Sequence, residues 1–307
     1  MRTYLRRLTF GSVIFIVIVL LTIPVSKIIQ HTREANMKTG EPTPKERETL
    51  IKNMEMKCIN EKDIHPETDP EAAEWFKRAR DIQKGVILGT DEEVIALYEK
   101  AVERKYWRAY SELAEIYLGS DTDRAIELLE EGMQQNIGRC YALMGNMLST
   151  GSGVKQDTLA AFAYQRKAAE LGFSPSMVVI GNKMYEVGAD SPGLKILQCA
   201  ADQGNPIAAY DLGMLHDDQK ISIYYLQKAT EYGHAGAALR LWGIFNDGDM
   251  NMTKDPERTK RYGKIMDYLD PLNPMGDYPT ILNLNDIVPL PPTPLPKWDG
   301  KIERSPK

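Results

Sequence analysis

Residue types that could carry chemistry are few in this sequence. The three cysteines, Cys58, Cys140 and Cys199, form no C-x-x-C pair, and an odd number leaves at least one thiol unpaired within one chain. The four histidines lie far apart and lack the spacing of metal ligands. They are His31, His65, His216 and His234. We therefore predict no catalytic residue, no cofactor and no metal site.

Three short motifs resemble parts of catalytic sites, but each has a simpler interpretation. The His216-Asp217-Asp218 cluster follows a predicted helix, and we interpret it as a solvated turn. Gly151-Ser152-Gly153 is not a nucleophile elbow, which needs glycine two residues before and two after the serine. It is not a phosphate-binding loop either, because no Gly-Lys-Ser/Thr follows. Cys140 and Cys199 stand where the surrounding pattern has small residues, which favours inert burial.

The stretch from Cys140 to Gly172 predicts two helices joined by a short connector. Gly151-Ser152-Gly153 would end the first helix, and Asp157 could accept hydrogen bonds at the start of the second. Gly172 suits the left-handed conformation beyond a helix end. Gly145 lies inside the first helix and costs it about 0.5–1 kcal/mol relative to alanine. We expect another helix to press against the backbone there.

The same pattern recurs along the chain. A small residue stands in the middle of a predicted helix at intervals of about 30–36 residues. These residues are Ala114, Gly145, Gly181, Gly213 and Gly243. The ending KAAELG of residues 167–172 returns as QCAADQG (198–204) and QKATEYG (227–233). One helix pair cannot bury its apolar face alone, so the recurrence predicts a stack of helix pairs with a continuous core.

The pattern A-x-x-x-L-G-x-x-Y…G-x-G-V-x-x-D…A-x-x-Y-x-x-A-A-x-x-G resembles the Sel1-like repeat, a relative of the tetratricopeptide repeat. The second unit carries it most fully, at Gly145, Gly151, Gly153, Val154, Asp157, Ala161, Tyr164, Ala168, Ala169 and Gly172. The resemblance covers roughly residues 91–270 and implies an all-α fold, an α/α solenoid of helix–turn–helix repeats. The third and fourth units lack the G-x-G-V-x-x-D connector, so we expect shorter or irregular turns there.

Stacked helix pairs create a concave surface that is lined by the first helix of each pair. We predict that variable positions on these helices contact a partner protein, although ordinary solvated or packing roles remain the alternative. The predicted partner-binding residues are Tyr141, Asn146, Asn182, Lys183, Asp211 and Arg240.

The N-terminus predicts a membrane anchor. Arg2, Arg6 and Arg7 precede an uncharged apolar run over residues 8–26, close to the ~20 residues that cross a ~30 Å hydrocarbon layer. A cleaved signal peptide is the main alternative and a buried core helix a weaker one; the match to a cleavage site is poor. We assign residues 1–29 to the anchor and 30–70 to a polar tether, with a short helix possible over 46–58. The short N-terminal tail favours an N-terminus inside the cell and the bulk of the chain on the extracytoplasmic side. In a bacterium this would be an inner-membrane protein whose bulk lies in the periplasm.

Residues 71–250 are assigned to the repeats and residues 251–307 to a closing segment. Asp255-Pro256-Glu257 predicts the start of a helix, and the prolines of residues 289–296 favour an extended polyproline path. We expect the apolar residues of this proline-rich segment to pack along the last repeat as a cap. They are Ile281, Leu282, Leu284, Ile287, Val288, Leu290 and Trp298. A ligand for an aromatic groove is the alternative.

The run Y-P-x-x-x-x-L-N-x-I-V-P-L-P-P-x-x-L-P-x-W-D-G resembles the ending of an uncharacterised bacterial domain attached to Sel1-like repeats. The matching residues are Tyr278, Pro279, Asn285, Ile287, Val288, Pro289, Leu290, Pro291, Pro292, Leu295, Pro296, Trp298, Asp299 and Gly300. The resemblance implies a Gram-negative source. It also points to envelope proteins near toxin systems, including immunity proteins against type VI secretion lipase effectors.

The composition fits a protein-binding role. The 307 residues carry a net charge of −5 without a dominant basic stripe, which argues against a nucleic-acid partner. We predict a non-enzymatic, protein-binding solenoid, which by resemblance would neutralise a secreted lipase-type effector. An envelope scaffold or adaptor is the first alternative. An enzyme with an unrecognised site in the proline-rich segment is the second.

Overall fold

The structure is a computed structural model that describes residues 56–65, 69–186, 188–269 and 280–305. Within these ranges the regular secondary structure is helical, and an isolated antiparallel bridge joins Ile281 to Arg304. The chain divides into two compact units, Met1–Gly193 and Leu194–Lys307, and each is described by itself.

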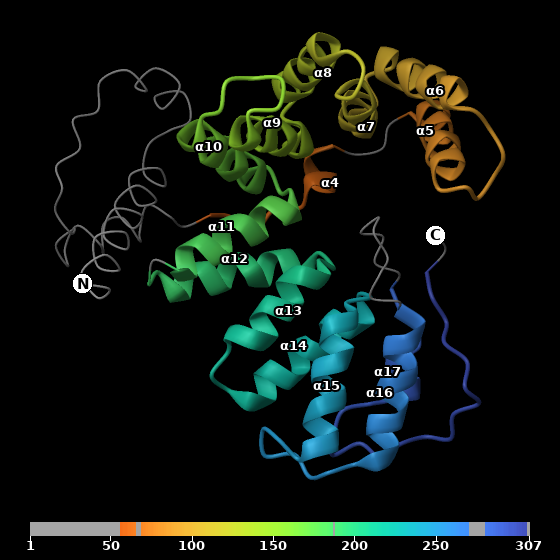
Figure 1. Cartoon of the computed structure of the whole chain (residues 1–307), viewed down its shortest axis with the longest axis vertical. Helices are drawn as coiled ribbons and strands as arrows, with labels where there is room; N and C mark the ends of the chain where they lie inside the picture. Colours follow the sequence, from red (N-terminus) through yellow and green to blue (C-terminus); the bar gives the residue numbers. More distant parts are fainter. Residues whose placement is uncertain (1–55, 66–68, 187, 270–279, 306–307) are drawn as a thin grey trace, which may run out of the picture. The chain divides into compact units, whose positions relative to one another are not determined.

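The first unit is a row of helices that pack in consecutive pairs. It contains α4 (Glu61–Ile64), α5 (Pro70–Gln83), α6 (Asp91–Glu103), α7 (Trp107–Tyr117), α8 (Thr122–Gln134), α9 (Gly138–Thr150), α10 (Thr158–Glu170) and α11 (Ser174–Glu186). Figure 1 shows α7 and α9 on the inner side of the row and α8 on its outer side. This arrangement confirms the predicted helical solenoid.

Helices α9 and α10 begin and end where the sequence signals stand. Gly151 caps α9 with a φ of +77°, and Gly172 follows α10 with a φ of +89°. The Asp157 side chain accepts a hydrogen bond from the Ala160 amide at 3.0 Å, at the start of α10. A Cβ atom on Gly145 would lie 3.0 Å from the carbonyl oxygen of Ala161. The predicted close approach of a second helix at Gly145 is confirmed.

Helix α12 (Asp190–Asp202) spans the division between the two units, and the second unit continues with two helix pairs and a closing segment. Its helices are α13 (Pro206–Leu215), α14 (Gln219–Glu231), α15 (Ala235–Asp247), α16 (Pro256–Leu269) and the single turn α17 (Leu284–Ile287). Residues 216–218 alone connect α13 to α14, whereas residues 151–157 connect α9 to α10. The shorter turn expected in the fourth unit is therefore confirmed.

The mid-helix glycines of the second unit differ in their surroundings. A Cβ on Gly213 would lie 2.8 Å from Leu226 Cγ, so the helices approach closely at this position. Nothing lies within 4 Å of a Cβ built on Gly243, and the close approach expected there is wrong. Helices α15 and α16 meet around a large side chain instead, because a Cβ on Gly263 would lie 3.7 Å from the Trp242 ring.

The closing segment packs on α14 and α16, as predicted for a cap. Its residues Ile281, Leu284, Ile287 and Val288 are buried. Side chains of both helices donate to its backbone. Arg261 Nη1 of α16 donates to the Ile287 carbonyl at 2.6 Å, and Gln227 Nε2 of α14 donates to the Val288 carbonyl at 2.9 Å.

Two details of the predicted cap differ from the structure. Leu282 is 62% exposed, and its predicted packing is wrong. The Ile281 amide donates to the Glu231 carbonyl and the Leu282 amide to that of Glu303. Adjacent side chains of extended chain point to opposite faces, so Leu282 turns outward when Ile281 turns in. In addition, residues 284–287 form the helical turn α17, where extended chain was expected.

The predicted anchor and most of the predicted tether lie outside the described residues. Within the described ranges, no helix is long and apolar enough to cross a membrane. Of the short helix predicted over 46–58, the structure describes only residues 56–58, which are not helical.

The contrast between Gly213 and Gly243 gives a matched test of packing. Gly213→Ala should lower the free energy of unfolding, because the new methyl group overlaps Leu226. Gly243→Ala should raise it by about 0.5–1 kcal/mol, because alanine is the better helix former and space is open. Urea unfolding followed by circular dichroism measures both. Equal effects of the two substitutions would contradict the close helix packing at Gly213 and the open space at Gly243.

Candidate partner-binding surface

Four of the six predicted contact residues lie in the first unit, on α9 and α11. Tyr141 is half-buried, donates its hydroxyl to the Met133 carbonyl at 3.3 Å and packs against Tyr164. Asn146 is exposed, and its Oδ1 accepts from the side-chain Nε2 of Gln165 at 2.8 Å. Lys183 Nζ pairs with Glu186 Oε2 at 2.6 Å, and Asn182 is half-buried. Of these four, Asn146 presents the most open side chain to a partner.

The other two predicted residues lie in the second unit. Asp211 on α13 is half-buried, and Arg240 on α15 pairs with Asp249 at 3.0 Å across the end of its own helix. A partner would compete with this ion pair. The contact role of all six residues stays a prediction.

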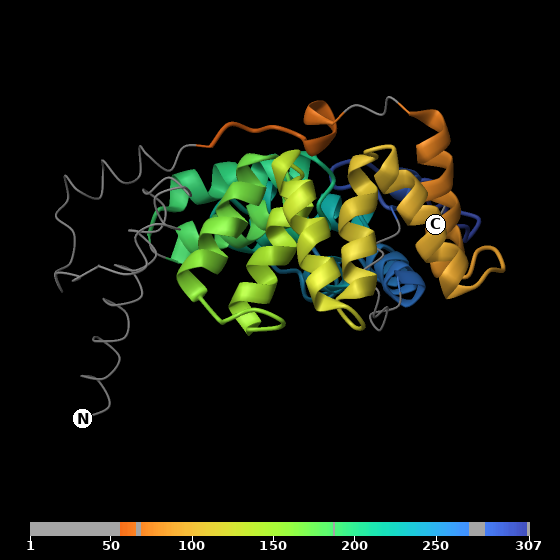
Figure 2. The same ribbon diagram turned by 90° about the horizontal axis from the view of Figure 1, so that it is seen from above.

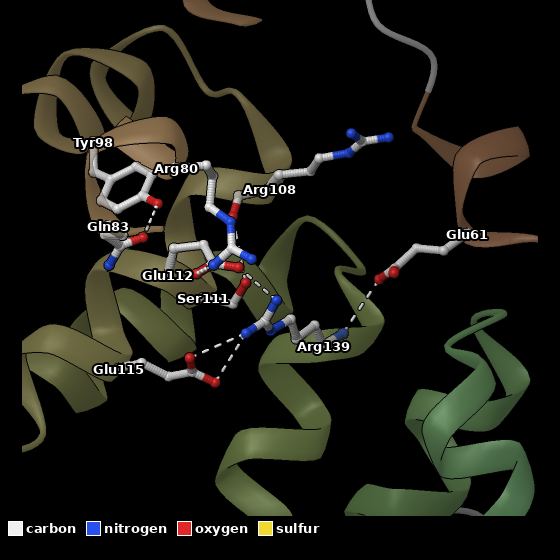
Figure 3. Close-up of polar contacts among 9 residues, drawn as sticks. All are labelled: Glu61, Arg80, Gln83, Tyr98, Arg108, Ser111, Glu112, Glu115 and Arg139. Carbon is white, nitrogen blue, oxygen red and sulfur yellow. Dashed lines mark hydrogen bonds and ion pairs between the residues drawn. The ribbon is translucent and has the colours of Figure 1, made fainter. Parts of the chain in front are cut away.

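A buried carboxylate joins three first helices of consecutive pairs in the first unit (Figure 3). Glu112 on α7 has a side chain only 5% exposed. Its Oε2 accepts from Arg80 Nη1 of α5 at 2.9 Å, and its Oε1 accepts from Arg139 Nη1 of α9 at 2.5 Å. Arg139 Nη2 also donates to both carboxylate oxygens of Glu115 at 3.0 Å. These charged bonds fix α5, α7 and α9 against one another on the inner side of the row.

Sequence reasoning missed this network, although one of its members, Glu112, carries a local signal. Glu112 lies in the small-residue and apolar stretch of α7, between the buried residues Ser111 and Leu113. A buried acid must be paired with a cation, so an acid on the core-facing side of a predicted helix was the available signal. The partners come from other repeats, which sequence spacing does not identify.

The polar groups of this region are engaged in holding the structure together. The Ser111 hydroxyl donates to the Arg108 carbonyl at 3.4 Å, and the Tyr98 hydroxyl donates to Gln83 Oε1 at 2.6 Å. Cys140 has a free thiol, and burial raises its pKa well above the ordinary value, which keeps it protonated at neutral pH. Within the described part of the chain, no group of three or more histidine, cysteine or acidic residues could hold a metal ion.

Residues 56–65, here called the N-terminal strap, run along one edge of the first unit (Figure 2). They contact the turns that precede successive first helices. The His65 ring stacks on Trp107 with centroids 5.3 Å apart, and its Nε2 lies 3.1 Å from the Asn136 carbonyl oxygen. A Cβ on Gly172 would lie 2.5 Å from the Glu61 amide nitrogen. This part of the predicted tether is therefore docked on the repeats.

Glu61 of the strap supplies a cap that the sequence of α9 lacks. The N-cap residue Ile137 has no side-chain hydrogen bond to the helix. Glu61 Oε1 instead accepts from the Arg139 backbone amide at 3.2 Å. Burial raises the pKa of Glu61 from its ordinary value of 4.5, and the amides of Arg139 and Gly138 oppose this shift. The free N–H group of Arg139 at the start of α9 is thus satisfied by a residue 78 positions away.

The strap predicts a specific pH dependence. Because the folded state binds the Glu61 proton more tightly than the unfolded state, the stability due to this group falls as the pH rises through the raised pKa. Glu61→Gln keeps an acceptor oxygen and removes this loss, so its stability relative to wild type should increase with pH. Glu61→Ala should cost about 1 kcal/mol, as for other lost caps. The free energy of unfolding, measured across the acidic and neutral pH range, tests both predictions. If the stability of the wild type rose relative to that of Glu61→Gln as the pH rises, the raised pKa of Glu61 would be wrong.

The Glu112 network predicts a large effect of a single substitution. Glu112→Ala leaves Arg80 and Arg139 without their shared buried partner and should lower the free energy of unfolding by about 3 kcal/mol. Glu127→Ala removes a surface pair with Arg124 on α8 and should cost less than about 1 kcal/mol. Thermal or urea unfolding compares the two. Similar small losses for both would show that Glu112 does not join the helices.

The comparison with protein families and curated proteins gives one match. Residues 239–306 match a domain of unknown function (DUF6396), which begins in α15 and includes α16 and the closing segment. This match agrees with the uncharacterised bacterial domain expected from the proline-rich run. None of the curated protein sequences matches the chain.

Three solved structures are similar to most of this chain. Immunity protein PA5088 from Pseudomonas aeruginosa is 29% identical, with a TM-score of 0.62, over 78% of this chain and 95% of its own. Immunity protein Pa5087 from the same organism is 28% identical, with a TM-score of 0.60, over 78% of this chain and 96% of its own. A Sel1 repeat protein from Oxalobacter formigenes, 21% identical over 66% of this chain and 91% of its own with a TM-score of 0.55, shares the fold.

Proposed function

This chain is a Sel1-like repeat protein, and from that premise we propose that it is an immunity protein that binds and neutralises an antibacterial effector. The observation that supports the proposal is the likeness to immunity protein PA5088, which extends over 95% of that protein at 29% identity. Helical repeats alone would fit any scaffold, so the proposal rests on the likeness to immunity proteins in particular.

The organisation of the described residues is consistent with a binding role. Stacked helix pairs offer an extended surface to another protein. The buried acid Glu112, the buried thiol of Cys140 and the strap residue Glu61 all serve packing or capping. Neutralisation would follow from covering the active site of the effector.

The finer proposal concerns the effector and the compartment. We propose a lipase-type effector delivered by a type VI secretion system, and an inner-membrane anchor over residues 1–29 that holds the solenoid in the periplasm. An enzyme that attacks membrane lipids after delivery to the periplasm must be met there. The uncharged run of residues 8–26 is the support for the anchor.

Co-expression tests this function. The effector encoded by the adjacent reading frame, directed to the periplasm, should stop growth, and the full chain should restore it. A chain without residues 1–29 should fail to rescue because it stays in the cytoplasm. The matched control is that shortened chain behind a cleavable signal peptide, which should rescue. Growth arrest that persists with the full chain would contradict the immunity function, and rescue by the cytoplasmic form would contradict the compartment.

A further inference from the structure

The second helices of the pairs provide an internal comparison of surface positions. Helices α6, α8, α10, α12 and α14 each contain 13 residues. Equivalent positions can therefore be read directly by counting from the first residue. A side chain that is large, apolar and exposed on one of these helices, where the others have small or polar residues, is not required by the repeat.

Helix α14 differs from the other second helices at two such positions. The third position holds Glu93, Arg124, Ala160 and Pro192 in the other four helices, and Ile221 in α14. The sixth position holds Ala96, Glu127, Ala163 and Lys195 in the others, and Tyr224 in α14. Ile221 is 38% exposed and Tyr224 is 49% exposed. Exposed apolar and aromatic side chains thus replace the small or polar residues of the other repeats.

These two residues begin a continuous stripe along α14. Ile221, Tyr224 and Lys228 follow one another at spacings of three or four residues, which places them on one face of α14. Tyr232, the residue that caps the end of the helix, stands four residues further on. Lys228 Nζ lies 5.8 Å from the centre of the Tyr232 ring. We call these four residues the α14 stripe.

The stripe is separate from the residues of α14 that form the core. Ile223, Leu226 and Ala229 of the same helix are buried. The Tyr224 ring meets the half-buried Tyr225 edge-on, with centroids 5.2 Å apart. Tyrosines in such a setting supply much of the binding energy at protein interfaces.

The same face of the next second helix already holds a segment of chain. Counting from the first residue of α16, the third and sixth positions are Arg258 and Arg261, and both are buried. Arg258 Nε donates to the Pro289 carbonyl at 3.3 Å, and Arg261 Nη1 donates to that of Ile287 at 2.6 Å. The closing segment therefore crosses α16 on the face that α14 leaves exposed. In this unit, that helix face is able to bind an extended segment.

The charges around the stripe decide which partner fits. Within the stripe, Lys228 Nζ pairs with Glu231 Oε2 at 3.0 Å. Asp202 and Glu231 both interact electrostatically with Tyr232. Asp217, Asp218 and Lys220 stand just before Ile221 in the sequence, so acids outnumber bases around the stripe. Paired with itself in a second copy, the stripe would bring an excess of acid against acid. A different protein with an apolar surface and basic side chains at its edge is complementary.

From these observations we propose that the α14 stripe binds the effector, at an apolar surface of the effector that is bordered by basic residues. The inference rests on the proposed immunity function and names its contact surface. Tyr224 and Ile221 are the central contacts. The stripe lies outside the six residues predicted from the sequence, because it is on a second helix and not on a first helix.

Binding of the purified full-length chain, in detergent, to the effector encoded by the adjacent reading frame tests the proposal. Tyr224→Ala and Ile221→Ala should each raise Kd roughly tenfold or more, as at other interface hot spots. Leu282→Ala is the matched control, because Leu282 is an exposed apolar residue of the same unit and should leave Kd within about twofold. Circular dichroism should show equal helicity for all variants, since the stripe is not part of the core.

The possible outcomes separate this inference from the function on which it rests. Wild-type affinity in Tyr224→Ala and Ile221→Ala, with binding intact, overturns the stripe and leaves the immunity function standing. Equal losses in those variants and in Leu282→Ala also overturn it. A dimer that dissociates in Tyr224→Ala shows that the occupant is a second copy and overturns the choice of partner. No binding by the wild type removes the immunity function and the inference together.

Discussion

The close approach of helix backbones at small residues is the constraint on which the repeat packing depends. A helix pair of this length cannot bury its apolar stripe alone, so each must lie against the next. Beside Gly145 a methyl group would meet the Ala161 carbonyl, and beside Gly193 it would meet that of Gly181 at 2.8 Å. Larger residues there would push the helices apart and open the core. Position Gly243 escapes the constraint, because nothing lies within 4 Å of a Cβ built there.

The elements whose signals are local could be predicted from the sequence. Asp157 and Asp255 each accept a backbone amide hydrogen bond at the start of the helix that follows, and Gly151 ends α9 in a left-handed conformation. These signals act within a few residues, so reading the chain in order finds them. Burial in the closing segment was predicted for both Ile281 and Leu282, and only the prediction for Ile281 is confirmed. Which of two adjacent side chains faces inward depends on the carbonyl groups with which the extended backbone pairs, and these lie far away in the sequence.

The contacts that join distant residues could not be predicted in this way. The Arg139 side chain donates to Glu112, which is 27 residues away in the sequence, and its backbone amide donates to Glu61, which is 78 residues away. No spacing in the sequence encodes such a pair, since each is set by which turns and faces the solenoid brings together. The proposed binding stripe on α14 is similar. It becomes visible only when exposure is known, because the exposed Tyr224 and the buried Tyr98 are the same residue type, each on the second helix of a pair.

The docked strap has a consequence for the order in which the protein assembles. Residues 56–65 leave the ribosome before any helix of the repeats. However, the Glu61 carboxylate accepts from the Arg139 amide, and the His65 ring contacts the Asn136 carbonyl, so both depend on residues synthesised much later. Contacts between distant parts of the chain form after local ones, because closing the long loop costs entropy first. The first described part of the chain to be synthesised is thus among the last to be fixed. Until then, α9 keeps an uncapped terminus, and the edge of the first unit stays open to water and to other chains.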